Sequence, residues 1–209
     1  MNSSLYKYIL GVADNCLILG QRLGELCGHG PSLETDIACT NISLDLFGQV
    51  RSYYQYAAKV AGDNRKEDDI AMMRPEREYV NVLLVEQPNT DFAFTIARQF
   101  LFDVYHYLFL NELQKSKDET LHAIARKSSK EVSYHLRFSS DWIKRLGDGT
   151  EESHNKMQKA FNEMKDEVRE IILELQKKNE LSKPEIASIK YKLNQQRDQH
   201  KLVNFDDEL

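Results

Sequence analysis

The stretch 100-FLFDVYHYLFL-110 places one aspartate and one histidine, three residues apart, among aromatic and aliphatic side chains. The run predicts a helix, and burying the carboxylate of Asp103 there without a partner would cost several kcal/mol. Residues three apart share one face of a helix, so Asp103 and His106 either satisfy each other or bind a metal ion together. The polar residues of the other helices decide between these two interpretations.

The composition bounds the class of protein. Of 209 residues, 41% are hydrophobic and 29% are charged, so the chain can bury a substantial core. The net charge of −5 shows no excess of basic residues, and nucleic acid is therefore not expected as a partner. Cys16, Cys27 and Cys39 form no CxxC pair, which is typical of reduced thiols in a cytoplasmic protein. Residues 1–20 hold no run that could span a bilayer and no basic start of a signal peptide, so we expect a cytoplasmic location and no membrane contact.

The pattern of glycine, proline and apolar residues predicts an all-α fold. Only 9 Gly and 4 Pro interrupt the chain, and alternating apolar–polar runs are scarce. Long amphipathic helices with one long crossover between the second and the third are typical of a ferritin-like helical bundle. The expected caps of the third and fourth helices are Asn89 and a capping box of Ser116 and Glu119. The expected helices cover about residues 5–27, 32–61, 89–113 and 116–147, and a connector covers 63–88.

The chain is expected to divide into a bundle and a more densely charged extension. Residues 1–150 are expected to form the ferritin-like helical bundle, and residues 151–209 a charged C-terminal helical extension. Pro184 separates two charged helices in the extension, the first of which has only a weak apolar seam. A solvated helical hairpin or a tail explains this pattern, and a coil that binds a partner is the alternative.

Two polar features of the first half are expected on the surface. On the first helix Asp14, Gln21 and Glu25 form a stripe opposite the apolar face, so we expect them to point away from the core. The stretch 74-RPERE-78 is expected to be a loop of surface ion pairs, each of which contributes little to stability.

Ferritin-like carboxylate proteins hold two metal ions between four helices. Two helices each supply a lone carboxylate, and the other two each supply a Glu-x-x-His pair whose members converge on one ion. Carboxylates together with imidazole suit iron or manganese. The third helix of this chain supplies Asp103 and His106, but the second offers only Asp45, with Gly48 three residues further on. The second helix therefore has no histidine to complete a ligand pair.

The fourth helix departs from this template as well. Tyr134 stands three residues after Glu131, where a histidine is expected, and His135 follows one position later. We therefore interpret these residues as a degenerate, di-iron-like polar cluster that is satisfied internally. No bound metal, cofactor-binding residue or catalytic residue is expected in this chain. The cluster comprises Asp45, Asp103, His106, Glu131 and His135.

Two longer strings, 83-LLVEQPN-89 and 131-EVSYHLRFS-139, lie within a nearly continuous similarity from about Leu5 to Met164. Through them the chain resembles the PaaC family, the structural C subunits of the bacterial multicomponent phenylacetyl-CoA 1,2-epoxidase. The resemblance implies a ferritin-like subunit that pairs with a catalytic A subunit, whose di-iron centre inserts one oxygen atom into the aromatic ring of phenylacetyl-CoA. It also implies that a separate reductase, which carries flavin and an iron–sulfur centre, delivers the electrons. The C subunits of this family resemble a decayed copy of A without a working metal centre.

From this resemblance we expect a non-catalytic structural subunit in aerobic phenylacetate catabolism, which is not an enzyme by itself. Its partners would be the catalytic A subunit, further copies of this chain within a hetero-oligomer, other epoxidase subunits and the reductase. The sequence departs from the family's pattern after 154-HNKMQKAFNEMK-165, at about residue 165. Two other functions stay open: a carboxylate-bridged di-iron oxygenase that uses the residues of the polar cluster, and a free-standing helical interaction module.

Overall fold

The computed structural model describes residues 3–177, and every regular element in this part of the chain is a helix. The described helices gather in two compact units. Residues 3–86 and 116–124 form what we call the N-terminal unit, and residues 87–115 and 125–177 form the C-terminal unit. The predicted all-α, ferritin-like class of fold is confirmed. None of the helices described is long and apolar enough to cross a membrane.

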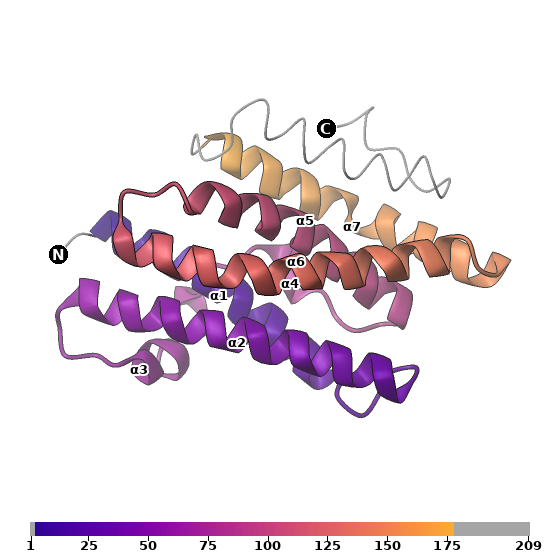
Figure 1. Ribbon diagram of the computed structural model, residues 1–209, viewed down its shortest axis with the longest axis horizontal. Helices are drawn as coiled ribbons and strands as arrows, with labels where there is room; N and C mark the ends of the chain where they lie inside the picture. Colours follow the sequence, from indigo (N-terminus) through magenta and orange to yellow (C-terminus); the bar gives the residue numbers. More distant parts are fainter. Residues whose placement is uncertain (1–2, 178–209) are drawn as a thin grey trace. The chain divides into compact units, whose positions relative to one another are not determined.

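In the N-terminal unit, α1 (Ser3–Glu25) and α2 (Leu33–Ala61) lie side by side (Figure 1). At Gly20 the two helices are in close contact, because a Cβ atom there would come within 3.0 Å of the Phe47 ring. The Ser43 hydroxyl donates a 2.6 Å hydrogen bond to the Gly20 carbonyl and fixes the same contact. Both helices bury apolar residues spaced three or four apart. These include Ile9, Cys16, Leu19 and Leu23 of α1 and Ile42, Leu46 and Tyr53 of α2.

A tight turn joins these two helices. Gly28 has a φ of +83°, in the left-handed region that favours glycine. The backbone N–H groups of Gly28 and Gly30 donate to the Asp36 carboxylate at 3.0 and 3.1 Å. Ser32 caps α2 by accepting a hydrogen bond from the N–H of Thr35. The predicted end of the first helix and start of the second are therefore confirmed.

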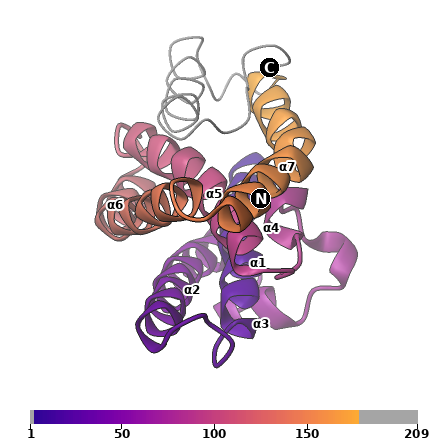
Figure 2. The same ribbon diagram turned by 90° about the vertical axis from the view of Figure 1, so that its right-hand side faces the viewer.

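The connector after α2 carries three short helical elements, α3 (Glu67–Met72), the 3₁₀ turn η1 (Glu76–Glu78) and α4 (Leu83–Glu86). Within the N-terminal unit α3 packs on α2, as Figure 2 shows, and α4 packs on α1. Leu84 and Val85 of α4 are buried, so this part of the connector contributes to the core.

The structure describes all three cysteines, and none of them forms a disulfide. Cys16 and Cys39 are buried, and Cys27 is exposed. Burial, helped by the negative charge of Asp14, raises the pKa of the Cys16 thiol to about 12. The Cys16 side chain is therefore a packing group and not a nucleophile.

In the C-terminal unit, α5 (Phe92–Leu113) is buried along most of its length and lies against α7 (Glu151–Lys177). The rings of Phe100 and Phe161 meet edge to face, with centroids 6.3 Å apart. The first part of the expected C-terminal extension thus packs on α5, and residues 178–209 lie outside the described residues. The residues that α7 buries are Met157, Ala160, Phe161 and Met164.

The start of α5 differs from the prediction. Asp91, not Asn89, is the N-cap, and it accepts a 2.8 Å hydrogen bond from the N–H of Phe94. The side-chain oxygen of Asn89 accepts instead from the Arg98 guanidinium, at 2.7 Å. Arg98 also donates to the carbonyl of Gln87. The predicted cap is wrong because Arg98, a buried arginine about two turns inside the helix, binds the side-chain amide of Asn89.

The start of α6 (Glu119–Gly147) differs in a similar way. Asp118 caps the helix by accepting hydrogen bonds from the N–H groups of Thr120 and Leu121, at 2.9 and 3.0 Å. The Ser116 hydroxyl accepts from the N–H of Asp118 and so supports the cap from outside the helix. The predicted capping box is therefore wrong, although the helix begins where the prediction placed its first turn.

Candidate functional site

A buried polar cluster lies where α5 and α6 meet in the C-terminal unit. Gln99 and Asp103 lie one turn apart on α5, Ser139 lies on α6, and all three are buried. The side-chain amide of Gln99 donates a 2.7 Å hydrogen bond to Oδ1 of Asp103. The hydroxyl of Ser139 donates a 2.8 Å hydrogen bond to Oδ2. Both carboxyl oxygens of Asp103 therefore accept from neutral donors of the protein itself.

Two histidines complete this cluster. His106 follows Asp103 by three residues on α5, His135 lies one turn before Ser139 on α6, and both are buried. Burial lowers the pKa of His106 to about 3, and electrostatic repulsion from His135 acts in the same direction. The ring of Phe102 packs beside His106, with centroids 5.1 Å apart. His106 is therefore an uncharged imidazole at neutral pH.

Burial also controls the charge of the carboxyl group. Removal from water raises the pKa of Asp103 to about 8, although the hydrogen bonds from Ser139 and Gln99 oppose the rise. A group with this pKa is mostly protonated at neutral pH. The carboxyl and the His106 imidazole are thus both neutral, which explains how the fold buries Asp103 without a positively charged partner.

A di-iron centre requires several ionised carboxylates that converge on the metal ions. In this cluster there is one fully buried carboxyl group, that of Asp103, and both of its oxygens accept hydrogen bonds from side chains. In the part of the chain that the structure describes, no group of three or more His, Cys, Asp or Glu side chains is placed to hold a metal ion. The described residues therefore do not fit a di-iron centre.

The structure brings together three of the five residues predicted for the polar cluster, namely Asp103, His106 and His135. Glu131 lies one turn before His135 on α6 and is half-buried. Asp45 belongs to the N-terminal unit, where it is half-buried on α2.

Ser139 was not among the predicted residues, although the sequence contains a signal for it. It stands four residues after His135 and therefore shares its helix face. Ser128, Val132, His135 and Ser139 are all buried and follow one another at three- and four-residue spacing. Small hydroxyl residues that continue the buried face of an amphipathic helix are candidates for partners of buried polar groups on a neighbouring helix.

A second buried polar cluster, centred on Asp14, lies in the N-terminal unit. The Arg74 guanidinium donates to both carboxylate oxygens of Asp14, at 2.6 and 3.1 Å. The Tyr54 hydroxyl and the N–H of Val80 also donate to this carboxylate, at 2.6 and 2.9 Å. Asp14 and Arg74 are both buried. The predictions that Asp14 points away from the core and that Arg74 belongs to a surface loop are therefore wrong.

The physical reason is that the connector covers this side of α1. Gln21 and Glu25 of the same predicted stripe are exposed, as expected, because they lie further along the helix. Burial lowers the pKa of Arg74, but the hydrogen bond and the charge of Asp14 outweigh it, so the net shift is upward. Burial, and then Asp14, raise the pKa of the Tyr54 hydroxyl. The cluster is thus an ionised pair that ties the connector to α1.

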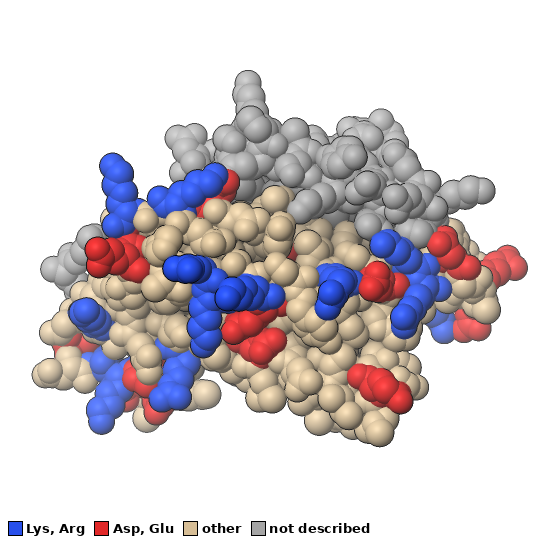
Figure 3. Space-filling view, in the orientation of Figure 1, with Lys and Arg blue, Asp and Glu red and all other residues tan. Residues whose placement is uncertain are grey.

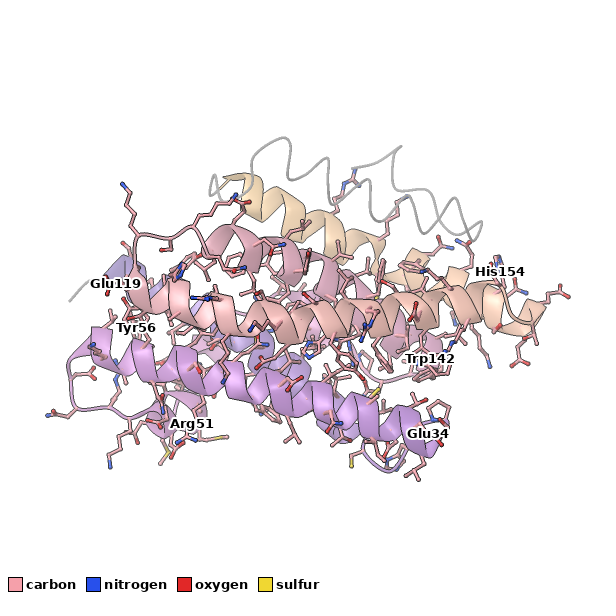
Figure 4. All side chains as sticks on the ribbon, viewed as in Figure 1. Glu34, Arg51, Tyr56, Glu119, Trp142 and His154 are labelled. Carbon is pink, nitrogen blue, oxygen red and sulfur yellow. The ribbon has the colours of Figure 1, made fainter. Side chains whose placement is uncertain are left out.

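A third carboxylate, Asp118, lies in the N-terminal unit and is half-buried. Asp118 directly precedes Glu119, the first residue of α6. Its carboxylate accepts a hydrogen bond from the hydroxyl of Tyr56 on α2. Figure 4 labels Tyr56 and Glu119. Hydrogen bonding to Asp118 raises the pKa of Tyr56 to about 12. The contact fastens the first turn of α6 to α2 within this unit.

Two comparisons with known proteins found related sequences. Residues 1–204 match the model of the family described as phenylacetic acid catabolic protein. This match includes residues 165–204, which follow the point where we expect the sequence to diverge. A relative from Escherichia coli (strain K12), the C subunit of 1,2-phenylacetyl-CoA epoxidase, is 52% identical over 162 residues. The aligned region covers 78% of this chain and 65% of the relative's length.

Proposed function

Because the chain belongs to the phenylacetic acid catabolic protein family, we propose that it is a structural, non-catalytic subunit of a phenylacetyl-CoA epoxidase complex. In this role it pairs with the catalytic A subunit, stabilises it and takes part in aerobic phenylacetate catabolism. The di-iron centre belongs to the A subunit, and a separate reductase with flavin and an iron–sulfur centre supplies electrons to the assembled complex. Further copies of this chain and other epoxidase subunits complete the hetero-oligomer.

The observation that carries this proposal is the donor set around Asp103. Its two oxygens accept hydrogen bonds from Gln99 and Ser139, so a metal ion would have to displace these donors to reach the carboxyl group. A catalytic subunit of a ferritin-like oxygenase would present ionised carboxylates at this place. The cluster instead supports the packing of α5 on α6.

Metal analysis of the purified full-length chain tests the non-catalytic role. After anaerobic loading with Fe(II) and removal of excess metal, we expect a negligible iron content and no oxygen-dependent change in the absorption spectrum. The alternative is a carboxylate-bridged di-iron oxygenase that uses Asp45, Asp103, His106, Glu131 and His135. An iron content that approaches two per chain, with reactivity toward oxygen, would establish that alternative.

Co-expression with the catalytic subunit tests the assembly. We expect the two chains to elute together in size-exclusion chromatography and the catalytic subunit to precipitate more readily when it is expressed alone. Separate elution of two well-folded chains would contradict the structural role. The metal analysis and this experiment are independent, so each part of the proposal can fail without the other.

A further inference from the structure

One face of α6 in the C-terminal unit carries positive charge along about five turns of the helix. Its residues follow one another at intervals of three or four positions and therefore lie on the same side of α6. Seven of its eight residues are exposed, and Lys144 is half-buried. Figure 3 shows basic side chains along this helix. We call this surface the α6 basic face, and it comprises Arg126, Lys127, Lys130, Tyr134, Arg137, Asp141, Lys144 and Arg145.

The α6 basic face has an excess of positive charge that the chain as a whole does not have. Six basic residues and one acidic residue give it a charge of +5, whereas the whole chain has a net charge of −5. The acidic residue, Asp141, lies 3.8 Å from Lys144. Among residues 3–177, Lys144 is the one cation of this face that lies within ion-pair distance of a carboxylate. Most of the positive charge of the face is therefore not neutralised within the described part of the chain.

The neighbouring helix α7 shows that this unit can neutralise exposed charges within a helix. Lys156 pairs with Glu152 at 2.6 Å, and Lys159 pairs with Glu163 at 3.6 Å, each across four residues. Opposite charges at this spacing stabilise a helix, and like charges at the same spacing destabilise it. On α6 the residue four positions after Arg126 is another cation, Lys130. Repeated like charges do not help α6 to fold, but an acidic partner would offset their repulsion.

An aromatic ring lies in the middle of the α6 basic face. Tyr134 is 40% exposed, and the guanidinium carbon of Arg137 lies 5.8 Å from the centroid of its ring. Tyrosine and arginine are enriched among the residues that carry the binding energy of protein interfaces. From Arg126 to Arg145 the face is about 28 Å long, because a helix rises about 1.5 Å per residue. These dimensions and residue types fit the surface of another protein better than a single small anion.

We propose that the α6 basic face is a docking surface for the acidic surface of a protein that binds and leaves during turnover. The inference rests on the proposed function, in which the reductase is the partner that delivers electrons to the assembled complex. It adds to that function the surface of this chain on which the reductase docks and the charge of the surface that the reductase presents.

The composition of the face favours a transient partner over a permanent subunit. The cores of permanent interfaces are depleted in charged residues and rich in apolar ones. Tyr134 is the one large apolar side chain of α6 that is exposed, and cations surround it. A surface charge of one sign speeds the encounter with an oppositely charged protein more than it prolongs the complex. A reductase that has to bind and leave repeatedly requires this kind of contact.

Steady-state epoxidation by the assembled complex, with the concentration of the reductase varied, tests the proposal. Lys130→Glu/Arg137→Glu is compared with Lys7→Glu/Lys59→Glu, because both double variants reverse two exposed cations and change the net charge by the same amount. We expect the first to raise the apparent KM for the reductase at least about tenfold with kcat nearly unchanged, and the second to raise it less than about twofold. Raising the ionic strength from about 0.05 M to about 0.5 M should increase the KM of the parent toward that of the first variant, because salt screens the attraction.

A milder pair of substitutions guards against a disturbed fold. Lys130→Gln/Arg137→Gln removes the two charges without reversing them, and it should raise the KM in the same direction by a smaller factor. Unfolding curves of all variants should match the parent, because the substituted side chains are exposed. Equal KM values for the parent, the glutamine variant and the two glutamate variants would overturn the proposal.

Size-exclusion chromatography of the same chains with the A subunit separates this inference from the proposed function. We expect the parent and all variants to elute together with the A subunit. If the Lys130→Glu/Arg137→Glu chain alone failed to do so, the α6 basic face would belong to the contact with the A subunit, and the proposal would be overturned. Separate elution of the parent chain and the A subunit would contradict the proposed function, and this inference with it.

Discussion

The two units bury an aspartate in opposite ways. In the N-terminal unit Asp14 meets the Arg74 guanidinium in a two-pronged contact, and the pair stays ionised. In the C-terminal unit Asp103 meets only the neutral donors of Gln99 and Ser139, and burial raises its pKa to about 8. One carboxylate is therefore compensated by an opposite charge, and the other loses its charge by retaining a proton.

The two units should therefore respond differently to substitutions and to pH. An ionised buried pair is sensitive to the loss of either member, because the remaining charge has no solvent to stabilise it. A neutral hydrogen-bonded cluster tolerates the loss of a member better but responds to pH, because its protonation differs between the folded and unfolded chains. Substitutions in each unit separate these two behaviours.

Arg74→Met should have the largest effect. It leaves the Asp14 carboxylate buried with only Tyr54 and the N–H of Val80 as donors, and we expect a loss of about 3–5 kcal/mol in the free energy of unfolding. Urea unfolding followed by circular dichroism measures the loss. Arg77→Met, which removes an exposed cation three residues further on, should change the free energy by less than about 0.5 kcal/mol. Similar effects of the two substitutions would show that the Asp14–Arg74 pair does not stabilise the unit.

His106→Ala should have a smaller effect, because it removes a neutral side chain and leaves a cavity. We expect a loss of about 2 kcal/mol in the free energy of unfolding, measured by urea unfolding, and no change in the iron content of the chain. Tyr134→Ala, which removes a larger but partly exposed ring, should cost less than His106→Ala. Loss of iron on substitution of His106 would mean that this residue is a metal ligand, and the comparison between the two units would then have to be redrawn.

The parts of the structure that the sequence predicted depend on neighbours along the chain. The periodicity of apolar residues and the Gly28 turn predicted where α1 and α2 end and begin, and a three-residue spacing predicted that Asp103 and His106 share a face. The burial of Asp14 could not be predicted, because its partner Arg74 is 60 residues away in an irregular connector. Polar residues that point toward an irregular segment have the same sequence pattern as those that point toward water.

The helix caps show the same limit of prediction from sequence, here between residues that are close together in the chain. The predicted cap Asn89 and the observed cap Asp91 are both good capping residues, and the local sequence does not choose between them. The choice is made by Arg98, which binds the amide of Asn89 from inside the fold. Ser139 is a similar case, because its helix face could be read from the sequence, but its hydrogen bond to Asp103 depends on how α5 and α6 meet.

Asp103→Asn should remove a pH dependence that the parent chain has. Between about pH 4 and pH 8 the folded chain binds a proton at Asp103 that the unfolded chain has released, so stability falls as pH rises. His106, with a folded pKa of about 3, acts in the opposite direction, but only below its ordinary value of 6.5. Between pH 6.5 and 8 we therefore expect the Asp103 effect alone, with a slope of up to about −1.4 kcal/mol per pH unit.

Urea unfolding of both chains across this pH window measures the effect. The amide introduced at position 103 resembles the protonated carboxyl in shape and hydrogen-bonding capacity, but it has no proton to release in the unfolded chain. The Asp103→Asn chain should therefore already be more stable than the parent at pH 6.5, and the difference should grow as the pH rises to 8. His106 and His135 lie close to the group and are present in both chains, so their contributions cancel in the difference. If the free energies of unfolding of the two chains changed in parallel with pH, Asp103 would be ionised in the folded chain, as Asp14 is.

Tyr56→Phe should have the smallest effect, and it tests how the solvent exposure of a carboxylate changes the cost of losing a hydrogen-bond donor. It removes the hydrogen bond to Asp118, a carboxylate that is only half-buried, so water can replace the lost donor. Burial raises the pKa of Asp118, but the hydrogen bonds from Tyr56 and from the N–H groups at the helix start outweigh it and lower the pKa overall. We therefore expect a loss of about 0.5–1 kcal/mol at pH 7, measured by urea unfolding, that shrinks as the pH falls through the folded pKa of Asp118. A loss as large as that of Arg74→Met would mean that hydrogen bonding, and not burial of charge, sets the difference between the carboxylates of this chain.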